Sequence, residues 1–213
     1  MWENLGKVAG EYPHLSKFDP EKNNKIQIYG KKNLLLVKKT KTPAIFFSGH
    51  LANWEILPNI AIKNGVPVLT IFRRPNNPFI NFLIKYIRSN LPMAPKGKEG
   101  AKQLIYSLKK GRSIGLVIDQ KMNDGIKVPF FNKPAMTSDA LAQLCLRIKS
   151  LVIPVGVERI KNTNFKITFH DPLKITKNGQ KKTPLQIMTE VNLIMEKWIR
   201  KNPGQWLWLH RRW

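Results

Sequence analysis

The residues best suited to chemistry in this sequence are His50 and Glu55, which lie five positions apart in FFSGHLANWE. Inside one helix, residues at this separation lie about 140° apart around the axis, so their side chains would not meet. We therefore place His50 in the turn before a helix and Glu55 in the first or second helical turn. The carboxylate can then reach one ring nitrogen and leave the other free. A neutral imidazole oriented in this way could act as a general base on a hydroxyl supplied by a substrate.

The surroundings of this pair bear on whether it is catalytic or structural. A histidine and a glutamate near a turn are more often a hydrogen-bonded structural pair, and the spacing alone does not exclude this alternative. The apolar run at 44–48 indicates a buried strand, which places His50 at its carboxyl end, where ligands gather in open α/β sheets. The N-terminus of the following helix would also disfavour a charged imidazole, as a base requires.

Apolar runs and helical patterns alternate along the chain. Runs rich in Ile, Val and Phe predict strands at 44–48, 66–72, 113–119, 151–160 and 165–171. Amphipathic patterns predict helices at 51–63, 78–89, 99–110, 137–149 and about 184–201, the fourth capped by Thr137 or Ser138. The segment 174–183 is predicted to be a polar loop. We expect one α/β domain over residues 1–213, with a central, mostly parallel sheet flanked by helices.

The charge balance is the unusual feature of the composition. The 213 residues carry a formal net charge of +24, with 42% hydrophobic residues, which is ordinary for a folded protein. Such a charge favours polyanionic partners: nucleic acid, anionic lipid headgroups or an acidic carrier protein. Part of it is also explained by a biased genome composition, because Lys, Asn and Ile are all abundant.

Several other chemistries lack their motifs. The sequence has no G-x-S-x-G, no paired cysteines and no His-x3-His, so we predict no metal and no nucleotide. The one cysteine, Cys145, is expected in the core. The stretch 44–62 contains His50, Asn53 and Glu55, which argues against a membrane span. No signal peptide is visible at the start.

The motif SGHLANWEI resembles the signature of the lipid A biosynthesis acyltransferases, the bacterial lauroyl and myristoyl transferases within the lysophospholipid acyltransferase superfamily. The resemblance extends over nearly the whole chain. Further segments that are similar to the family, in the same order, are WENLG, EYPHL, FRRPNNP, IRSN, LKKG, a strand ending in DQ, VPFF and QWLWLHRRW.

The resemblance implies a glycerolipid acyltransferase-like fold and a defined reaction. A fatty acyl chain would pass from acyl carrier protein to a hydroxyl of a lipid A precursor at the cytoplasmic face of the inner membrane. His50 would be the base and Glu55 would orient it, with no cofactor and no covalent acyl-enzyme. Acylation of another phospholipid or glycolipid is the alternative. A basic nucleic-acid-binding protein is the rival class, but it does not explain SGHLANWE and we expect no nucleic-acid partner.

Four further residues match the family near its site. Arg74 and Arg88 match family arginines, and their guanidinium groups suit glycolipid phosphates or an oxyanion; a solvated helix face is the alternative. Asp119 and Gln120 end a predicted strand and match the family's Asp, where the carboxylate would orient an arginine or the substrate. Structural capping is equally compatible with their position.

The two ends of the sequence carry further expectations. In QWLWLHRRW, tryptophans alternate with Arg211 and Arg212, which suits either a membrane interface or a tail packed on the core. His210 is expected to be structural. Relatives usually carry an apolar membrane helix before the WENLG region, and Met1 falls just there, so we expect peripheral association with an anionic membrane surface through basic residues.

Overall fold

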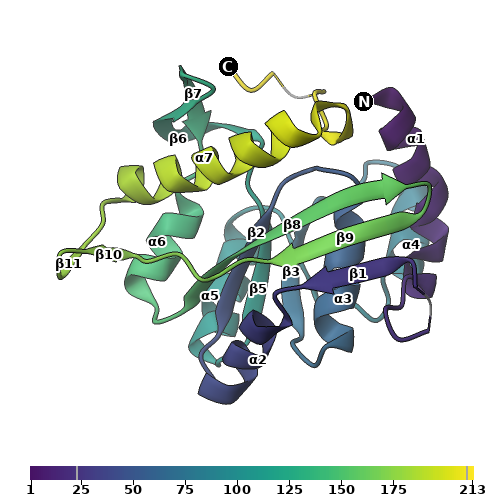
Figure 1. The fold of residues 1–213 in the computed structure, drawn as a ribbon, viewed down its shortest axis with the longest axis horizontal. Coiled ribbons are helices and arrows are strands. Elements are labelled where there is room, and N and C mark those ends of the chain that lie inside the picture. Colours follow the sequence, from purple (N-terminus) through teal and green to yellow (C-terminus); the bar gives the residue numbers. More distant parts are fainter. Residues whose placement is uncertain (23, 210) are drawn as a thin grey trace.

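The computed structural model describes residues 1–22, 24–209 and 211–213. Within them the chain forms an α/β fold around a seven-stranded, mostly parallel sheet, as predicted (Figure 1). The strands of this sheet are β1 (Ile26–Tyr29), β2 (Ala44–Ser48), β3 (Val68–Phe72), β4 (Met93–Pro95), β5 (Ser113–Val117), β8 (Leu151–Lys161) and β9 (Asn164–Phe169). Their order is β1-β9-β8-β2-β5-β3-β4, and only β8 and β9 pair antiparallel.

Helices lie on both sides of the sheet. In Figure 1 the long helix α7 crosses above it and α2 lies below it. The helices are α1 (Trp2–Glu11), α2 (Lys31–Thr40), α3 (Leu57–Lys63), α4 (Pro78–Ile87), α5 (Lys98–Lys109), α6 (Ala140–Arg147) and α7 (Pro184–Lys201), with 3₁₀ segments η1 (Tyr12–Lys17), η2 (Trp54–Ile56) and η3 (Pro203–Gln205). Two hairpins complete the fold: β6 (Lys121–Phe130) with β7 (Lys133–Thr137), and β10 (Thr176–Lys177) with β11 (Gln180–Lys181).

Burial is deepest at the centre of the sheet. All five residues of β2 are buried, as expected for a strand with parallel neighbours on both sides. Its side chains pack with those of β5 and β8, such as Ile114 and Ile153. Cys145 on α6 also belongs to this core, as predicted, and burial raises the pKa of its thiol to about 11. The rigid centre of the sheet therefore ends at the loop that carries His50.

Several expected elements differ in extent. The predicted helix at 51–63 starts later, because residues 51–53 form a turn in which Ala52 has a positive φ of 48°. The predicted helix at 137–149 begins at Ala140 with Asp139 in the N-cap position, and the predicted cap Ser138 accepts a hydrogen bond from Ala140 N at 3.4 Å. The polar loop at 174–183 contains the β10–β11 hairpin, whose turn residues Asn178 and Gly179 both have positive φ, as a tight hairpin turn requires. Helix α7 matches its prediction and begins with a Thr183 capping box.

Candidate active site

His50 and Asp119 occupy equivalent positions after neighbouring strands. Each follows its strand by two residues, His50 after β2 and Asp119 after β5. The two strands pair in parallel, with Ser48 beside Val117. Because the carboxyl ends of parallel strands meet at one edge of a sheet, the two side chains leave that edge next to each other.

Asp119 is the carboxylate that holds the His50 ring. Its Oδ1 lies 2.7 Å from His50 Nδ1, and its Oδ2 accepts hydrogen bonds from the His50 backbone N–H at 2.8 Å and from Trp206 Nε1 at 2.7 Å. Its side chain is 3% exposed. Burial acts to raise the pKa of Asp119, but the hydrogen bonds from His50 and Trp206 outweigh it, and the pKa lies below its ordinary value. Asp119 is therefore an ionised acceptor.

This contact assigns the tautomer of the neutral imidazole. Nδ1 carries the proton that Asp119 accepts, which leaves Nε2 as the basic atom. Gln120 Nε2 lies 3.4 Å from His50 Nε2, and the Trp54 ring packs edge-on against the imidazole with centroids 4.8 Å apart. The His50 side chain keeps 15% of its surface exposed. A base that is oriented on one side and reachable on the other meets the geometric requirement of general-base catalysis.

Gly49 allows the carboxylate to approach so closely. A Cβ built at this position would lie 3.3 Å from Asp119 Oδ2 and 2.1 Å from the Cε atom of Met195 on α7. A side chain here would therefore have to move the end of the Met195 side chain and would crowd the partner of His50. The glycine between strand and histidine leaves room for both.

Glu55 does not make the contact predicted for it. Its carboxylate forms an ion pair with Arg88 and accepts a hydrogen bond from Trp54 Nε1 at 3.0 Å. Its backbone N–H is held by the side chain of Asn53, the N-cap of η2. The prediction that Glu55 reaches a ring nitrogen is thus wrong: η2 turns its side chain toward α4, and Asp119 occupies the place beside the ring. Glu55 is connected to the His50 ring through Trp54, which packs on the imidazole.

The two arginines have different surroundings. Arg88 follows α4 and is largely buried, with 12% of its side chain exposed, between Glu55 and the ring of Tyr12, whose centroid lies 5.5 Å from Cζ. Burial lowers its pKa. Arg88 is therefore not on a solvated helix face. Arg74 lies in the exposed loop between β3 and α4, and its interaction with a substrate stays a prediction.

Both ends of the chain hold the loop of His50. Leu207 N donates to the His50 carbonyl at 3.0 Å, and Ala52 N donates to the Gln205 carbonyl at 3.0 Å. On the other side, Asn53 donates to Glu11 of α1, which forms a buried ion pair with Arg159 of β8. The His50 loop is thus held by segments that are distant in sequence.

The C-terminal motif QWLWLHRRW is partly packed on the core and partly exposed. Trp206 and Arg212 are 3% and 1% exposed, and Arg212 donates to Thr137 Oγ1 at 2.7 Å. Trp208 and Trp213 are about half exposed. The alternative of a tail packed on the core is therefore correct for Trp206 and Arg212. His210 lies outside the described residues.

Sequence reasoning missed the contacts of Asp119 with His50 and Trp206. Asp119 was expected to orient an arginine or the substrate, and Trp206 was expected at a membrane or in the core. One signal was available: the predicted strands at 44–48 and 113–119 end just before His50 and at Asp119, and adjacent parallel strands would bring these residues together. No local pattern relates Trp206 to Asp119, because their hydrogen bond spans 87 positions.

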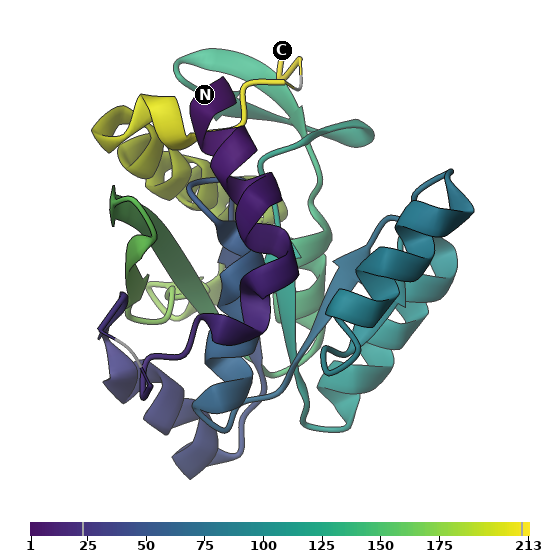
Figure 2. The same ribbon diagram turned by 90° about the vertical axis from the view of Figure 1, so that its right-hand side faces the viewer.

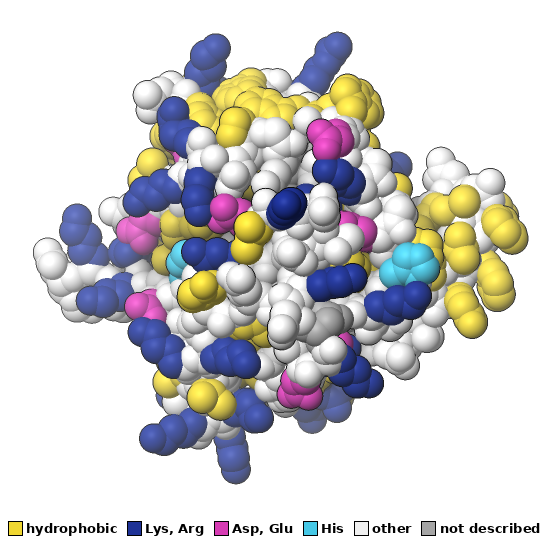
Figure 3. Space-filling view, turned by 45° about the vertical axis from the view of Figure 1, so that its right-hand side comes forward, with side chains coloured by type: hydrophobic (Ala, Val, Ile, Leu, Met, Phe, Trp, Pro, Cys, Tyr) yellow, Lys and Arg dark blue, Asp and Glu magenta, His cyan; other side chains and the backbone are white. Residues whose placement is uncertain are grey.

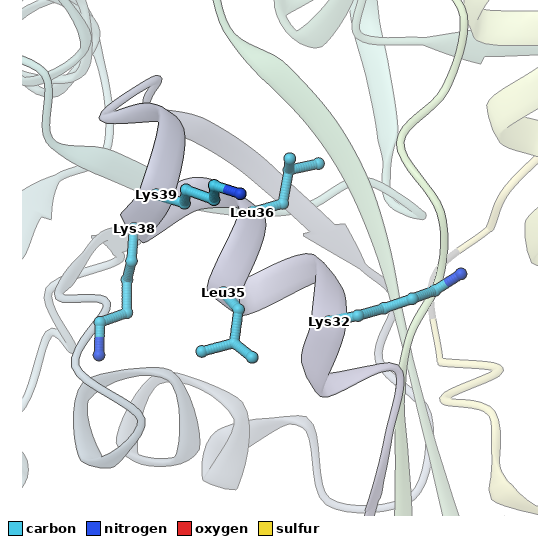
Figure 4. A pocket seen from close by; sticks show the side chains of 5 residues that line it. All are labelled: Lys32, Leu35, Leu36, Lys38 and Lys39. Atoms are coloured by element: carbon cyan, nitrogen blue, oxygen red, sulfur yellow. The ribbon is translucent and has the colours of Figure 1, made fainter.

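The best-defined hollows lie away from His50. The larger, of about 560 Å³, is lined by Lys32, Leu35, Leu36, Lys38 and Lys39 of α2. Figure 4 shows these side chains extending from α2 in different directions, so they do not converge on one point. The other hollow is lined by residues of the β10–β11 hairpin and its surroundings. Neither hollow is lined by His50, Asp119 or Glu55.

Two further properties concern metal and membrane. In residues 1–22, 24–209 and 211–213, no cluster of three or more His, Cys, Asp or Glu side chains is arranged to hold a metal ion. In the same part of the chain no helix has the length and hydropathy needed to span a bilayer.

An α/β sheet with a carboxylate-held histidine at its carboxyl edge is typical of enzymes that remove a proton from a hydroxyl group. The chain belongs to the bacterial lipid A biosynthesis acyltransferase family, whose model matches residues 1–213. It is therefore an acyltransferase of lipid A biosynthesis, and the family resemblance seen in the sequence is confirmed. No curated protein matches the sequence.

Proposed function

We propose that this protein transfers a fatty acyl chain from acyl carrier protein to a hydroxyl group of a lipid A precursor, with His50 as the general base. The observation that carries the proposal is the short contact of His50 Nδ1 with the buried carboxylate of Asp119, which makes Nε2 the basic atom of the ring. The family match supports the reaction class. The alternative is acylation of another glycolipid or phospholipid, and the test below distinguishes it from this proposal.

The reaction needs only the two substrates and this pair. Nε2 of His50 takes the proton of the acceptor hydroxyl while the hydroxyl oxygen attacks the thioester carbonyl. The C–S bond then breaks, and the imidazolium returns the proton to the leaving thiolate, so that an ester and a free carrier thiol result. Asp119 stabilises the imidazolium in between, as a buried carboxylate does in a Ser-His-Asp triad. We propose no cofactor, because the substrates supply all the atoms.

Glu55 and Arg88 are assigned to positioning. Glu55 holds the Trp54 indole, which packs on the imidazole, and it fixes the Arg88 guanidinium at the end of α4. Gln120 is placed to donate to Nε2 or to an acceptor oxygen that replaces this contact. Arg74 is exposed and is proposed to meet a phosphate of the acceptor.

The net positive charge of the protein supports the proposal of anionic partners. Acidic acyl carrier protein, a phosphorylated glycolipid and an anionic membrane surface all match a net charge of +24. Figure 3 shows Lys and Arg side chains spread over the viewed face rather than gathered in one stripe, which favours a broad surface over a nucleic-acid groove. We propose a peripheral location at the cytoplasmic face of the inner membrane.

The test uses purified protein, acyl carrier thioesters or acyl-coenzyme A as donors, and a phosphorylated glucosamine lipid or a lysophospholipid as acceptors. Mass spectrometry then identifies the product. We expect transfer from the carrier thioester to the glucosamine lipid, and a loss on the order of 10² to 10⁴ fold in His50→Ala. The matched control is His14→Ala, because His14 is exposed on η1.

Three outcomes would contradict the proposal. Unchanged turnover in His50→Ala would exclude the assigned base. Transfer only to the lysophospholipid would establish the alternative acceptor. Salt-sensitive binding to duplex DNA without any transfer would favour the rival class.

A further inference from the structure

Helix α4 directs its apolar face outward. Phe79, Phe82, Leu83 and Tyr86 have the spacing that normally faces a core, but they are 70%, 66%, 40% and 73% exposed. No residue of α4 is buried. In Figure 2 the helix projects from the body on the right, and in Figure 3 hydrophobic side chains gather on a protruding lobe at the right. We call these four residues the α4 face.

The helix that carries this face is well defined at both ends. Asn77 caps its N-terminus by accepting hydrogen bonds from the N–H groups of Phe79 and Ile80, and Pro78 occupies its first turn. At its C-terminus, Arg88 is bound to Glu55 and stacks on Tyr12. The α4 face is therefore connected to the His50 loop through Arg88 and Glu55.

Basic side chains lie next to the α4 face. Arg73 and Arg74 are exposed just before the helix, and Lys85 is exposed on it. The segment 73–88 contains no Asp or Glu. Exposed Phe, Leu and Tyr beside Lys and Arg form the surface of helices that lie in the headgroup region of anionic membranes. The charge of the segment is complementary to such a surface.

A second copy of the chain fits this face less well. A helix of ten residues is only about 15 Å long, and a stable protein interface needs roughly 800 Å² and 20 to 30 residues on each partner. The projecting face of one short helix does not offer that area. A bilayer needs no complementary shape and accepts a projecting surface.

We propose that the α4 face inserts into the interfacial region of an anionic bilayer and brings the His50 edge of the sheet to the membrane. The inference rests on the proposed function in one respect: the acceptor substrate is a lipid. Insertion itself is measured without acyl transfer, so the two proposals can fail separately. Because α4 ends at Arg88, which binds Glu55, the inserted face and the site are linked through this ion pair.

The test compares the intact protein with Phe79→Ser/Phe82→Ser/Tyr86→Ser in cosedimentation with vesicles of phosphatidylcholine and phosphatidylglycerol. We expect vesicle affinity to fall on the order of 10² fold, because three large apolar side chains lose their burial. The matched control is Leu35→Ser/Leu185→Ser/Leu193→Ser, whose residues are 61%, 48% and 49% exposed on α2 and α7. It should bind like the unchanged protein.

A second measurement separates insertion from attraction by charge alone. Because Cys145 is buried, a polarity-sensitive fluorophore can be attached selectively to Phe82→Cys or, as its control, to Leu35→Cys. We expect a blue shift on adding vesicles at position 82 and none at position 35. The circular dichroism of every variant should match that of the unchanged protein, because the altered side chains are exposed.

Three results would overturn the inference. The first is equal vesicle binding by the α4 triple variant, and the second is the absence of a fluorescence shift at position 82. The third is a dimer of the unchanged protein that the triple variant abolishes while vesicle binding persists, which would assign the face to a second copy. Vesicle binding that depends on α4 in a protein without transferase activity would contradict only the proposed function.

Discussion

Two carboxylates lie near His50, and their surroundings differ. Asp119 binds the imidazole, the His50 backbone and the Trp206 indole, none of which carries a fixed charge. Glu55 faces the permanent charge of Arg88. The first carboxylate can stabilise a charge that appears during a reaction, whereas the charge of the second is already compensated. The residue that follows the histidine by five positions thus binds an arginine, and the residue that contacts the ring comes just after the neighbouring strand.

Of the changes to the two carboxylates, Asp119→Asn should have the larger effect on turnover. An asparagine keeps the shape of Asp119 but loses the negative charge and can donate to Nδ1, which favours the wrong tautomer. We expect transfer to fall about 10³ to 10⁴ fold in a steady-state assay. The control is Asp124→Asn, an exposed position on β6. A loss of less than tenfold would remove Asp119 from the catalytic pair.

Glu55→Gln should affect stability more than chemistry. It leaves the Arg88 charge unpaired, so the free energy of unfolding should fall by about 2 to 3 kcal/mol in urea titrations, below the roughly 3 to 5 kcal/mol of fully buried pairs because both side chains keep some exposure. Turnover should fall only about tenfold, through displacement of Trp54. Glu55→Gln/Arg88→Gln should recover part of the stability. A larger loss of turnover than in Asp119→Asn would reverse the assignment of the two carboxylates.

Lowering the pH should reveal the ionised state of Asp119 through a smaller effect, a change in the free energy of unfolding. The pKa of Asp119 is lowered in the folded protein, so its ionised form contributes stability that is present above the unfolded value of about 3.9 and lost as the pH falls through the folded value. The difference in free energy of unfolding between the unchanged protein and Asp119→Asn should therefore shrink below pH 4. A difference that is constant from pH 7 to pH 3 would contradict the ionised state.

The sheet could be predicted from the sequence, because buried parallel strands are continuous apolar runs: 44–48 matches β2, and 151–160 matches β8 within one residue. Strands β1 and β4 and the β6–β7 hairpin were not predicted, since β1 and β4 have only four and three residues and β6 is mixed in polarity. The position of His50 followed from the end of β2. Its partner did not, because the contact depends on which strand lies beside β2, and the sequence does not state strand order. The contact of Trp206 with the site could not be predicted either. It depends on the C-terminal segment pairing with Leu51, a contact that spans more than 150 positions.

The tautomer of His50 is the most direct test of the central claim, that Asp119 and not Glu55 orients the base. Nitrogen-15 histidine spectra of the unchanged protein, Asp119→Asn and Glu55→Gln distinguish the two ring nitrogens, with His50→Ala to assign the signal. We expect a proton on Nδ1 and an unprotonated Nε2 in the unchanged protein and in Glu55→Gln, and a loss of this preference in Asp119→Asn. A tautomer that survives in Asp119→Asn but is lost in Glu55→Gln would contradict the account.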